Sequence, residues 1–212
     1  MKDAAPATRA TERVRRFYDR SAPDYDGWMR LFDRLLLGDG RKRTCARASG
    51  DTLELAIGTG LNLPFYRRDV RLTGVDLSPA MLAIAGRRAR ELGLRVELRP
   101  GDAQALDFPD GRFDTVVATL CLCTIPDERR ALAEAYRVLR PGGWLLLLEN
   151  VRSPVGPVRW VQRLLDPALV RLAGDHLLRD PLDHLAGLGF AVEQCARSKW
   201  GFVERVVAHR PR

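Results

Sequence analysis

A glycine-bearing loop and a later acidic residue have the clearest chemical potential in this sequence. The stretch LELAIGTG, residues 53–60, is an apolar run that carries Glu54 and passes directly into Gly58 and Gly60. Glycines there let the backbone approach a ligand without an intervening side chain. The next apolar run, RLTGVD, ends at Asp76, 16 residues beyond Gly60. A carboxylate at that strand end can accept hydrogen bonds from both hydroxyls of a ribose, so the pattern predicts a site for an adenosine-containing cofactor.

The main alternative for this loop is a nicotinamide dinucleotide site, which uses the pattern GxGxxG. Its third glycine lets a helix pack closely, and the pyrophosphate lies at the helix N-terminus. Here Leu63 takes the third position, and Pro64 follows it. The loop therefore favours a ligand without a pyrophosphate. A plain glycine turn does not explain why Glu54, the loop and Asp76 occur together.

From residue 51 onward, apolar runs typical of strands alternate with segments whose apolar residues have helical spacing. The expected strands are residues 51–57, 71–76, 94–98, 112–119, 143–149, 189–195 and 201–208. Two helices, over 79–92 and 127–139, begin with Ser-Pro and Pro-Asp start signals. This order predicts a parallel sheet with helices on both faces. The short link 196–200 makes the last two strands an antiparallel pair.

Four motifs, LELAIGTG, GVDLSPAML, GDAQALDFPDGRFD and YRVLRPGG, follow one another over residues 53–143. Together they resemble the class I S-adenosylmethionine-dependent methyltransferases. The resemblance implies an α/β fold with a Rossmann-like, doubly wound, seven-stranded sheet and an antiparallel last strand. It also implies S-adenosylmethionine as cofactor and S-adenosylhomocysteine as product. Residues 51–212 would form the methyltransferase domain, and residues 1–50 a helical extension or lid.

The resemblance also implies which residues bind the cofactor. Those expected near its methionine part are Glu54, Gly58, Thr59, Gly60, Thr119 and Leu120, and Ala56 and Asn62 complete the predicted set. Those expected near its adenosine part are Asp76, Leu77, Asp102 and Ala103. Asp76 would bind the ribose hydroxyls and Asp102 the exocyclic amine of adenine. Each aspartate alone could be an ordinary strand-end or turn residue, but their joint placement favours the cofactor roles. Ala56 departs from the family, which usually has glycine there, so a slightly displaced loop is expected.

The N-terminal segment FYDRSAPDYDGWM has a signature of its own. Similar tyrosine-aspartate pairs precede the glycine loop in relatives of the quinone C-methyltransferases and bacterial phospholipid N-methyltransferases, where this segment folds over the cofactor. By that resemblance, Tyr18 and Tyr25 are expected to contact cofactor or acceptor from a lid. The alternative is that both rings only pack between helices.

The methyl acceptor is expected beneath residues 152–180, which follow the fifth strand. Glu149 and Asn150 end that strand and are predicted to bind the acceptor, and His176 is the histidine placed to act as a base, if its role is not structural. An apolar stripe between residues 158 and 172 could form a lipophilic pocket wall, a membrane-facing surface or ordinary core, with a break or kink at Pro167. Three arginines of this segment, Arg159, Arg163 and Arg171, could meet anionic lipid headgroups or simply be solvated.

The resemblance gives an order of preference among candidate methyl acceptors. Residues 119–127 and 148–154, with the LLDPALVRLAGD stretch, look most like the methyltransferase-like thiol S-methyltransferases and related phospholipid N-methyltransferases. The order is a small thiol, then the amine of phosphatidylethanolamine, then a quinone ring carbon. Other classes are a nucleic-acid methyltransferase and a cofactor-binding protein without activity. The net charge of +8 suggests nucleic acid. Against it, the arginines are scattered, and Thr-Leu-Cys-Leu replaces the Asn-Pro-Pro-Tyr-type motif of base-amine methylating enzymes.

Length and composition describe one domain with a sizeable core. The chain has 212 residues, 46% of them hydrophobic. Its longest apolar stretch, 144–148, is far shorter than the roughly 20 residues that span a bilayer. The N-terminus lacks the apolar run of a secretory signal, so a cytoplasmic protein is expected, with peripheral membrane contact as an alternative. The four cysteines lack paired CxxC spacing and predict no metal. The oligomeric state stays open.

Overall fold

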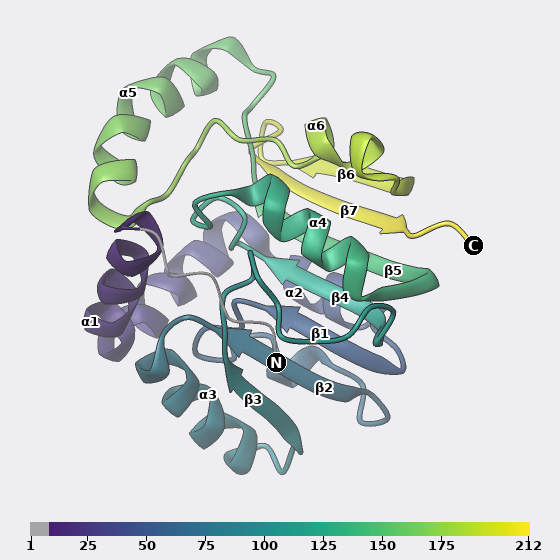
Figure 1. Cartoon of the computed structure of the whole chain (residues 1–212). Coiled ribbons are helices and arrows are strands. Elements are labelled where there is room, and N and C mark those ends of the chain that lie inside the picture. The colour runs from purple at the N-terminus through teal and green to yellow at the C-terminus, as the bar shows by residue number, and fades with distance from the viewer. Residues whose placement is uncertain (1–8) are drawn as a thin grey trace.

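The computed structural model describes residues 9–212, and its centre is one seven-stranded sheet (Figure 1). The strands are β1 Asp51–Leu55, β2 Arg71–Asp76, β3 Val96–Pro100, β4 Phe113–Thr119, β5 Leu139–Asn150, β6 Ala191–Ser198 and β7 Val203–His209. Their order is β3-β2-β1-β4-β5-β7-β6. The first five are parallel, and β7 runs antiparallel between β5 and β6. The predicted α/β fold with its antiparallel last strand is confirmed.

Helices cover both faces of this sheet (Figure 1). They are α1 Arg9–Phe32, α2 Gly40–Cys45, α3 Pro79–Glu91, α4 Glu128–Val138, α5 Gly156–Ala173 and α6 Leu182–Leu185, with a π-helical turn Asp33–Leu37 after α1. The start signals read from the sequence are in place. The Ser78 hydroxyl accepts a hydrogen bond from the Met81 N–H at 3.1 Å, and the Asp127 carboxylate accepts one from the Arg130 N–H at 2.9 Å.

The core lies on both sides of the central strands. Val116 and Ala118 of β4 belong to the hydrophobic cluster on one face, and Val117 belongs to the cluster on the other. In β5, Leu147 belongs to the first of these clusters and Leu146 to the second. Side chains alternate along a strand, so a strand buried on both faces must be apolar at every position. This explains the uninterrupted apolar runs in the sequence.

Several boundaries differ from the predicted ones. The fifth strand starts at Leu139 instead of 143, and its pairing with β4 shifts register between Phe113 and Thr115. The helix α5 continues through Pro167, so the break among the predicted alternatives, a break or a kink, is absent. A proline inside a helix removes one hydrogen bond, and the turns on either side are long enough to continue. None of the helices in residues 9–212 combines the length and hydropathy that a bilayer span requires.

Candidate functional site

A cavity that is partly open to solvent lies where β1, β2 and β4 end. These three strands are neighbours, and the chain order reverses between β1 and β4. Ligands of open α/β sheets bind at such a reversal, beyond the carboxyl ends of the strands. Thirteen of the fourteen predicted cofactor residues line the cavity: Tyr18, Tyr25, Glu54, Ala56, Gly58, Thr59, Asn62, Asp76, Leu77, Asp102, Ala103, Thr119 and Leu120.

The fourteenth, Gly60, does not line the cavity and has a backbone role instead. Its φ is +78°, and a Cβ there would lie 2.7 Å from the side chain of Leu63. Gly60 therefore allows the loop to turn tightly over Leu63. Ala56 has a φ of +46°, a conformation that costs a residue with a Cβ about 1–2 kcal/mol and costs glycine far less. The missing family glycine is thus accommodated with local strain.

The Asp76 carboxylate is the centre of the adenosine end of the cavity. Its two oxygens accept hydrogen bonds from the backbone N–H groups of Gly58 and Ser78, both at 2.8 Å. These bonds hold the carboxylate rigidly, and each oxygen keeps a lone pair for a ligand. Burial raises the pKa of Asp76 to about 6, with the two backbone bonds opposing that rise. The group is therefore ionised, and a hydrogen-bond acceptor only, above that pH.

Glu54 is buried beneath the other end of the cavity. Its oxygens accept hydrogen bonds from the Asn62 amide at 2.7 Å and from the Tyr66 hydroxyl at 2.9 Å. Burial raises the pKa of Glu54 to about 7, although both bonds lower it. The Asn62 amide also donates to the Thr119 hydroxyl at 2.7 Å. Glu54 and Asn62 therefore form one network that ties the glycine loop to the end of β4.

Arg41 lines the cavity and was not singled out in the sequence. It lies on α2 and is only 7% exposed. Its Nε donates to the Asp33 carboxylate at 2.8 Å and its Nη1 to the Asn62 side-chain oxygen at 3.0 Å. A guanidinium has five N–H donors, so the Nη2 donors stay available for a ligand. Nothing in the run GRKRTC distinguishes Arg41 from its basic neighbours.

At the adenine end, Asp102 is held by its neighbour Gln104. Its Oδ1 accepts hydrogen bonds from the backbone N–H and from the side-chain amide of Gln104, both at 2.9 Å. Gln104 in turn accepts the N–H of Asp127 at 3.0 Å, which joins this turn to the start of α4. Gln104 also lines the cavity. It is a second residue that the sequence analysis missed.

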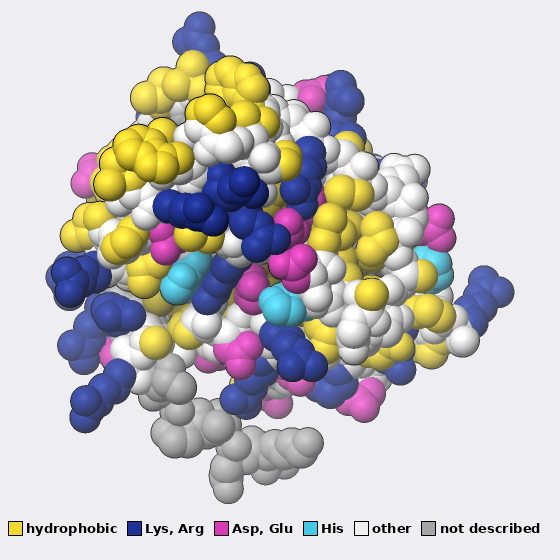
Figure 2. Space-filling view, turned by 90° about the horizontal axis from the view of Figure 1, so that it is seen from above, with side chains coloured by type: hydrophobic (Ala, Val, Ile, Leu, Met, Phe, Trp, Pro, Cys, Tyr) yellow, Lys and Arg dark blue, Asp and Glu magenta, His cyan; other side chains and the backbone are white. Residues whose placement is uncertain are grey.

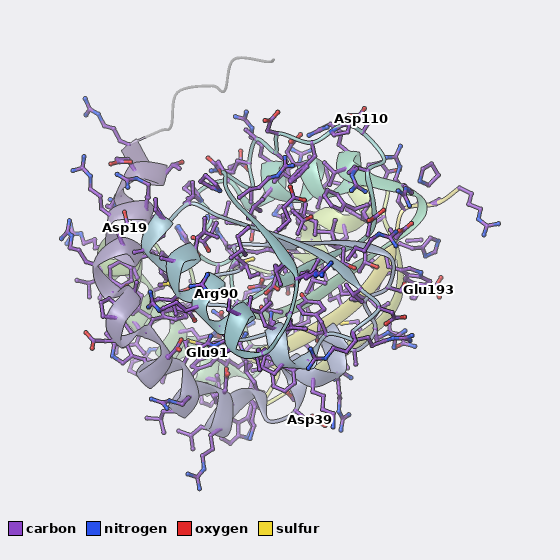
Figure 3. The ribbon with its side chains drawn as sticks, turned by 90° about the horizontal axis from the view of Figure 1, so that it is seen from below. Asp19, Asp39, Arg90, Glu91, Asp110 and Glu193 are labelled. Atoms are coloured by element: carbon purple, nitrogen blue, oxygen red, sulfur yellow. The ribbon has the colours of Figure 1, made fainter. Side chains whose placement is uncertain are left out.

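The helix α1 covers the cavity, and two of its aspartates attach it to the residues around the cavity. Near its middle, Asp19 accepts a hydrogen bond from the Ser78 hydroxyl at 2.6 Å. One turn beyond Pro23, Asp26 accepts one from the Thr59 hydroxyl at 2.6 Å and forms an ion pair with Arg88 of α3. Figure 3 shows Asp19 on α1 at the side of the molecule where α3 carries Arg90 and Glu91. Tyr18 and Tyr25 directly precede these two aspartates, and their rings meet edge to face with centroids 6.1 Å apart.

We expect the substitution Asp26→Asn to speed cofactor release about fivefold. A partly buried ion pair of this kind contributes roughly 1 kcal/mol, and the loss would fall on the closed position of α1. Stopped-flow release of S-adenosylhomocysteine measures the rate. Asp24→Asn is the matched control, because Asp24 is exposed on the same helix. Equal release rates for both variants would mean that this ion pair does not hold α1 over the cavity.

The predicted acceptor-side residues lie outside the cavity lining. Glu149 is 1% exposed, and its Oε1 accepts hydrogen bonds from the N–H groups of Cys121 and Leu122 at 3.0 and 3.2 Å. Burial raises its pKa to about 7. Asn150 pairs with Val203 in the sheet and is also buried. Glu149 thus holds the turn after β4, and binding of the acceptor by Glu149 and Asn150 stays a prediction.

His176 is also outside the cavity lining. Its backbone N–H donates to the Cys123 carbonyl at 2.9 Å, and burial lowers the pKa of its imidazole. This bond attaches the segment after α5 to the loop that follows β4. The structure therefore gives His176 a place beside the site, but none of the described side chains lining the cavity is a histidine.

The donor set of the cavity fits S-adenosylmethionine. Asp76 offers acceptors for two ribose hydroxyls and Asp102 an acceptor for an amine. Arg41 offers a buried cation for a carboxylate, and Glu54 gives the same end a nearby negative charge for an ammonium. This arrangement suits a nucleoside that carries an amino acid.

A family model described as a methyltransferase domain matches residues 53–147, and curated methyltransferases have similar sequences. A phosphatidylethanolamine N-methyltransferase from Cereibacter sphaeroides is 42% identical over 130 residues, covering 59% of this chain and 64% of that protein. A demethylmenaquinone methyltransferase from Thermus thermophilus is 40% identical over 158 residues, covering 69% and 70%. A human thiol S-methyltransferase is 34% identical over 158 residues, covering 70% and 64%. The chain thus spans just under two thirds of the first and third relatives.

Solved structures share the fold. The [4+2]-cyclase SpnF superposes with a TM-score of 0.77 at 22% identity, covering 99% of both chains. A geranyl diphosphate methyltransferase in complex with GPP and sinefungin superposes with a TM-score of 0.73 at 19% identity, covering 97% of this chain and 100% of the other. At such identities the likeness shows the architecture alone.

Proposed function

This chain belongs to the family of S-adenosylmethionine-dependent methyltransferases, and from that premise we propose that it methylates the amino group of a phospholipid headgroup such as phosphatidylethanolamine. Identity supports a lipid acceptor, because the relatives at 42% and 40% are named for phosphatidylethanolamine and demethylmenaquinone. The observation that carries the choice of an amine is the tyrosine pair in the cavity wall.

Tyr18 and Tyr25 suit an acceptor that becomes a methylated ammonium. Both rings line the cavity, and aromatic faces attract alkylated ammonium groups. Burial raises the pKa of both hydroxyls well above their usual range, so both stay neutral at physiological pH. They bind and orient the amine and do not remove its proton. The amine must arrive neutral, and its proton leaves to water.

The other residues of the site position the reacting groups. Bound S-adenosylmethionine supplies both the methyl electrophile and a good leaving group. Asp76 and Asp102 hold the adenosine part, and Arg41 holds the carboxylate of the methionine part. The helix α1, fastened through Asp26, excludes water. Such alignment can lower a barrier by roughly 7–11 kcal/mol, so the reaction requires no catalytic triad.

A small thiol is the second candidate. A thiol is partly ionised near neutral pH and needs little beyond placement. A cavity lining without a histidine is consistent with this chemistry, as is the 34% identity to the human thiol S-methyltransferase. This order reverses the one drawn from sequence motifs, because the tyrosine pair and the more similar relatives favour a lipid amine.

The acceptor can be identified with a panel of substrates and a labelled methyl donor. The panel contains short-chain phosphatidylethanolamine, alkyl thiols and demethylated quinones. We expect the amine to be methylated, and Tyr25→Leu to lower kcat/KM for it about tenfold while Tyr25→Phe keeps it. Methylation of thiols alone, or equal loss in both variants, would overturn the amine assignment.

A further inference from the structure

The helix α5 turns its apolar side outward. Trp160, Leu164 and Leu172 are 65%, 64% and 67% exposed, and Val161 and Leu165 beside them are exposed as well. At 100° per residue these five side chains fall on one side of the helix. A helix that packs on a core has the opposite orientation, so this stripe needs another explanation.

The inward side of α5 carries the half-buried Val158, Leu169 and Ala173 around one buried polar residue. Gln162 is its one buried residue. The Gln162 amide donates to the carbonyls of Val151 and Leu177, both at 2.9 Å, and its oxygen accepts from the Ser153 N–H at 2.8 Å. The hydrophobic clusters found in residues 9–212 contain no residue of α5. The one buried side chain of the helix is thus held by hydrogen bonds, and the five exposed apolar side chains contribute nothing to the core.

A second exposed tryptophan extends the stripe. Trp200 is 71% exposed at the tip of the β6–β7 hairpin. Its carbonyl accepts the Ser153 hydroxyl at 2.6 Å, and Pro154 packs against Gly201. The hairpin tip therefore lies at the start of α5, next to the exposed Val155. We call α5 together with this tip the α5 face.

Unpaired cations border the α5 face. Arg159, Arg163 and Arg171 have no ion-pair partner among residues 9–212, and Lys199 precedes Trp200 at the tip. Asp166, the acidic residue of α5, does not pair with these arginines. Its carboxylate accepts a hydrogen bond from the Leu177 N–H at 2.8 Å. Figure 2, which looks down from the α5 side, shows hydrophobic side chains in groups at the upper left with Lys and Arg side chains beside them.

We propose that the α5 face docks onto an anionic lipid bilayer, from which the acceptor reaches the site; this second part rests on the proposed function. Exposed Trp and Leu side chains bordered by arginines are the pattern of an interfacial helix. Each arginine near such a surface adds attraction to anionic headgroups. A second copy of the chain fits less well, because two such faces in contact would bring their arginines together. The basic chain, with a net charge of +8, agrees with an anionic partner.

The α5 face is also connected to the cavity. Directly after α5, Gly174 lies against Val14 of α1, and His176 binds the Cys123 carbonyl. Cys121 and Thr124 of that loop line the cavity, as does Val14. Docking through α5 therefore places α1 and the loop after β4 close to the bilayer surface. A lipid headgroup would have a short path to the tyrosine pair.

Vesicle flotation tests the docking. The vesicles contain phosphatidylcholine with about one third phosphatidylglycerol, or phosphatidylcholine alone. We expect the full chain to float with anionic vesicles, and Leu164→Glu to weaken that binding about tenfold or more. Val192→Glu is the matched control, because Val192 is exposed on β6, away from α5; it should float like the unchanged protein. Melting temperatures establish that both variants fold.

The docking and the proposed function are contradicted by different experimental results. If the protein does not float with anionic vesicles, or if Leu164→Glu floats as well as Val192→Glu, the docking surface is wrong. The same holds if Leu164→Glu only converts a dimer to a monomer. Turnover of monomeric short-chain phosphatidylethanolamine tests the function separately. Flotation without that turnover would contradict the proposal of an amine acceptor but not the proposal that the α5 face docks onto a bilayer.

Discussion

Replacing Asp76 by asparagine is expected to weaken binding of S-adenosylhomocysteine about 100-fold. Asp76 accepts two backbone N–H groups and offers its remaining lone pairs to the ribose hydroxyls. Hydrogen bonds to a charged acceptor contribute roughly 1.5–3 kcal/mol each, and 1.4 kcal/mol corresponds to a factor of ten. An asparagine NH₂ would also face one of the N–H donors. Calorimetric titration measures the dissociation constant.

Asp107→Asn is the matched control for this prediction. Asp107 is exposed in the turn before β4 and lies outside the cavity lining, so its loss should leave the affinity unchanged. The unchanged protein should also lose affinity as the pH falls through about 6, because the pKa of Asp76 lies there and the protonated group no longer accepts both hydroxyls. An Asp76→Asn variant that binds within threefold of the unchanged protein would remove Asp76 from the ribose site.

Replacing Arg41 by methionine should weaken S-adenosylhomocysteine binding about 30-fold and leave 5′-methylthioadenosine binding nearly unchanged. The first compound carries the carboxylate that Arg41 is proposed to hold, and the second has no amino-acid part. A buried guanidinium bound to a carboxylate makes strong charge-assisted hydrogen bonds. The variant should also lose about 2 kcal/mol of unfolding free energy, since the Asp33 carboxylate loses its partner.

Arg43→Met separates this effect from a general loss of charge. Arg43 lies on the same helix, but it is 61% exposed and pairs with the exposed Asp39. Its replacement should change neither affinity, since an exposed ion pair contributes little. If Arg41→Met weakened both ligands equally, Arg41 would support the cavity wall without contacting the amino-acid part.

Local patterns in the sequence predicted the loop and the strand end that line the cavity, and the resemblance to the methyltransferase family supplied the other predicted cofactor residues. The loop ending at Gly60, the strand ending at Asp76 and the caps Ser78 and Asp127 are all formed by residues close in sequence. Their structure therefore follows from short-range rules. Arg41 differs, because only the packing of α2 against the strand ends makes one arginine of a basic run buried. Sequence spacing carries no signal for that.

The segment after β5 shows the same limit. Helical spacing predicted an apolar stripe in residues 158–172, but periodicity does not tell which side of a helix is covered. The structure buries Gln162 and exposes Trp160 and Leu164. For a similar reason Glu149 was expected at the acceptor: a strand-end carboxylate can face a ligand or a backbone turn, and here it binds the N–H groups of Cys121 and Leu122.

The most direct test of the account is calorimetry of the unchanged protein with two ligands, S-adenosylhomocysteine and NADH. The account predicts one-to-one binding of S-adenosylhomocysteine in the micromolar range or tighter, because Asp76 binds its ribose and Arg41 binds the carboxylate at its other end. It predicts no heat with the second. Saturable binding of NADH without any heat from S-adenosylhomocysteine would contradict it.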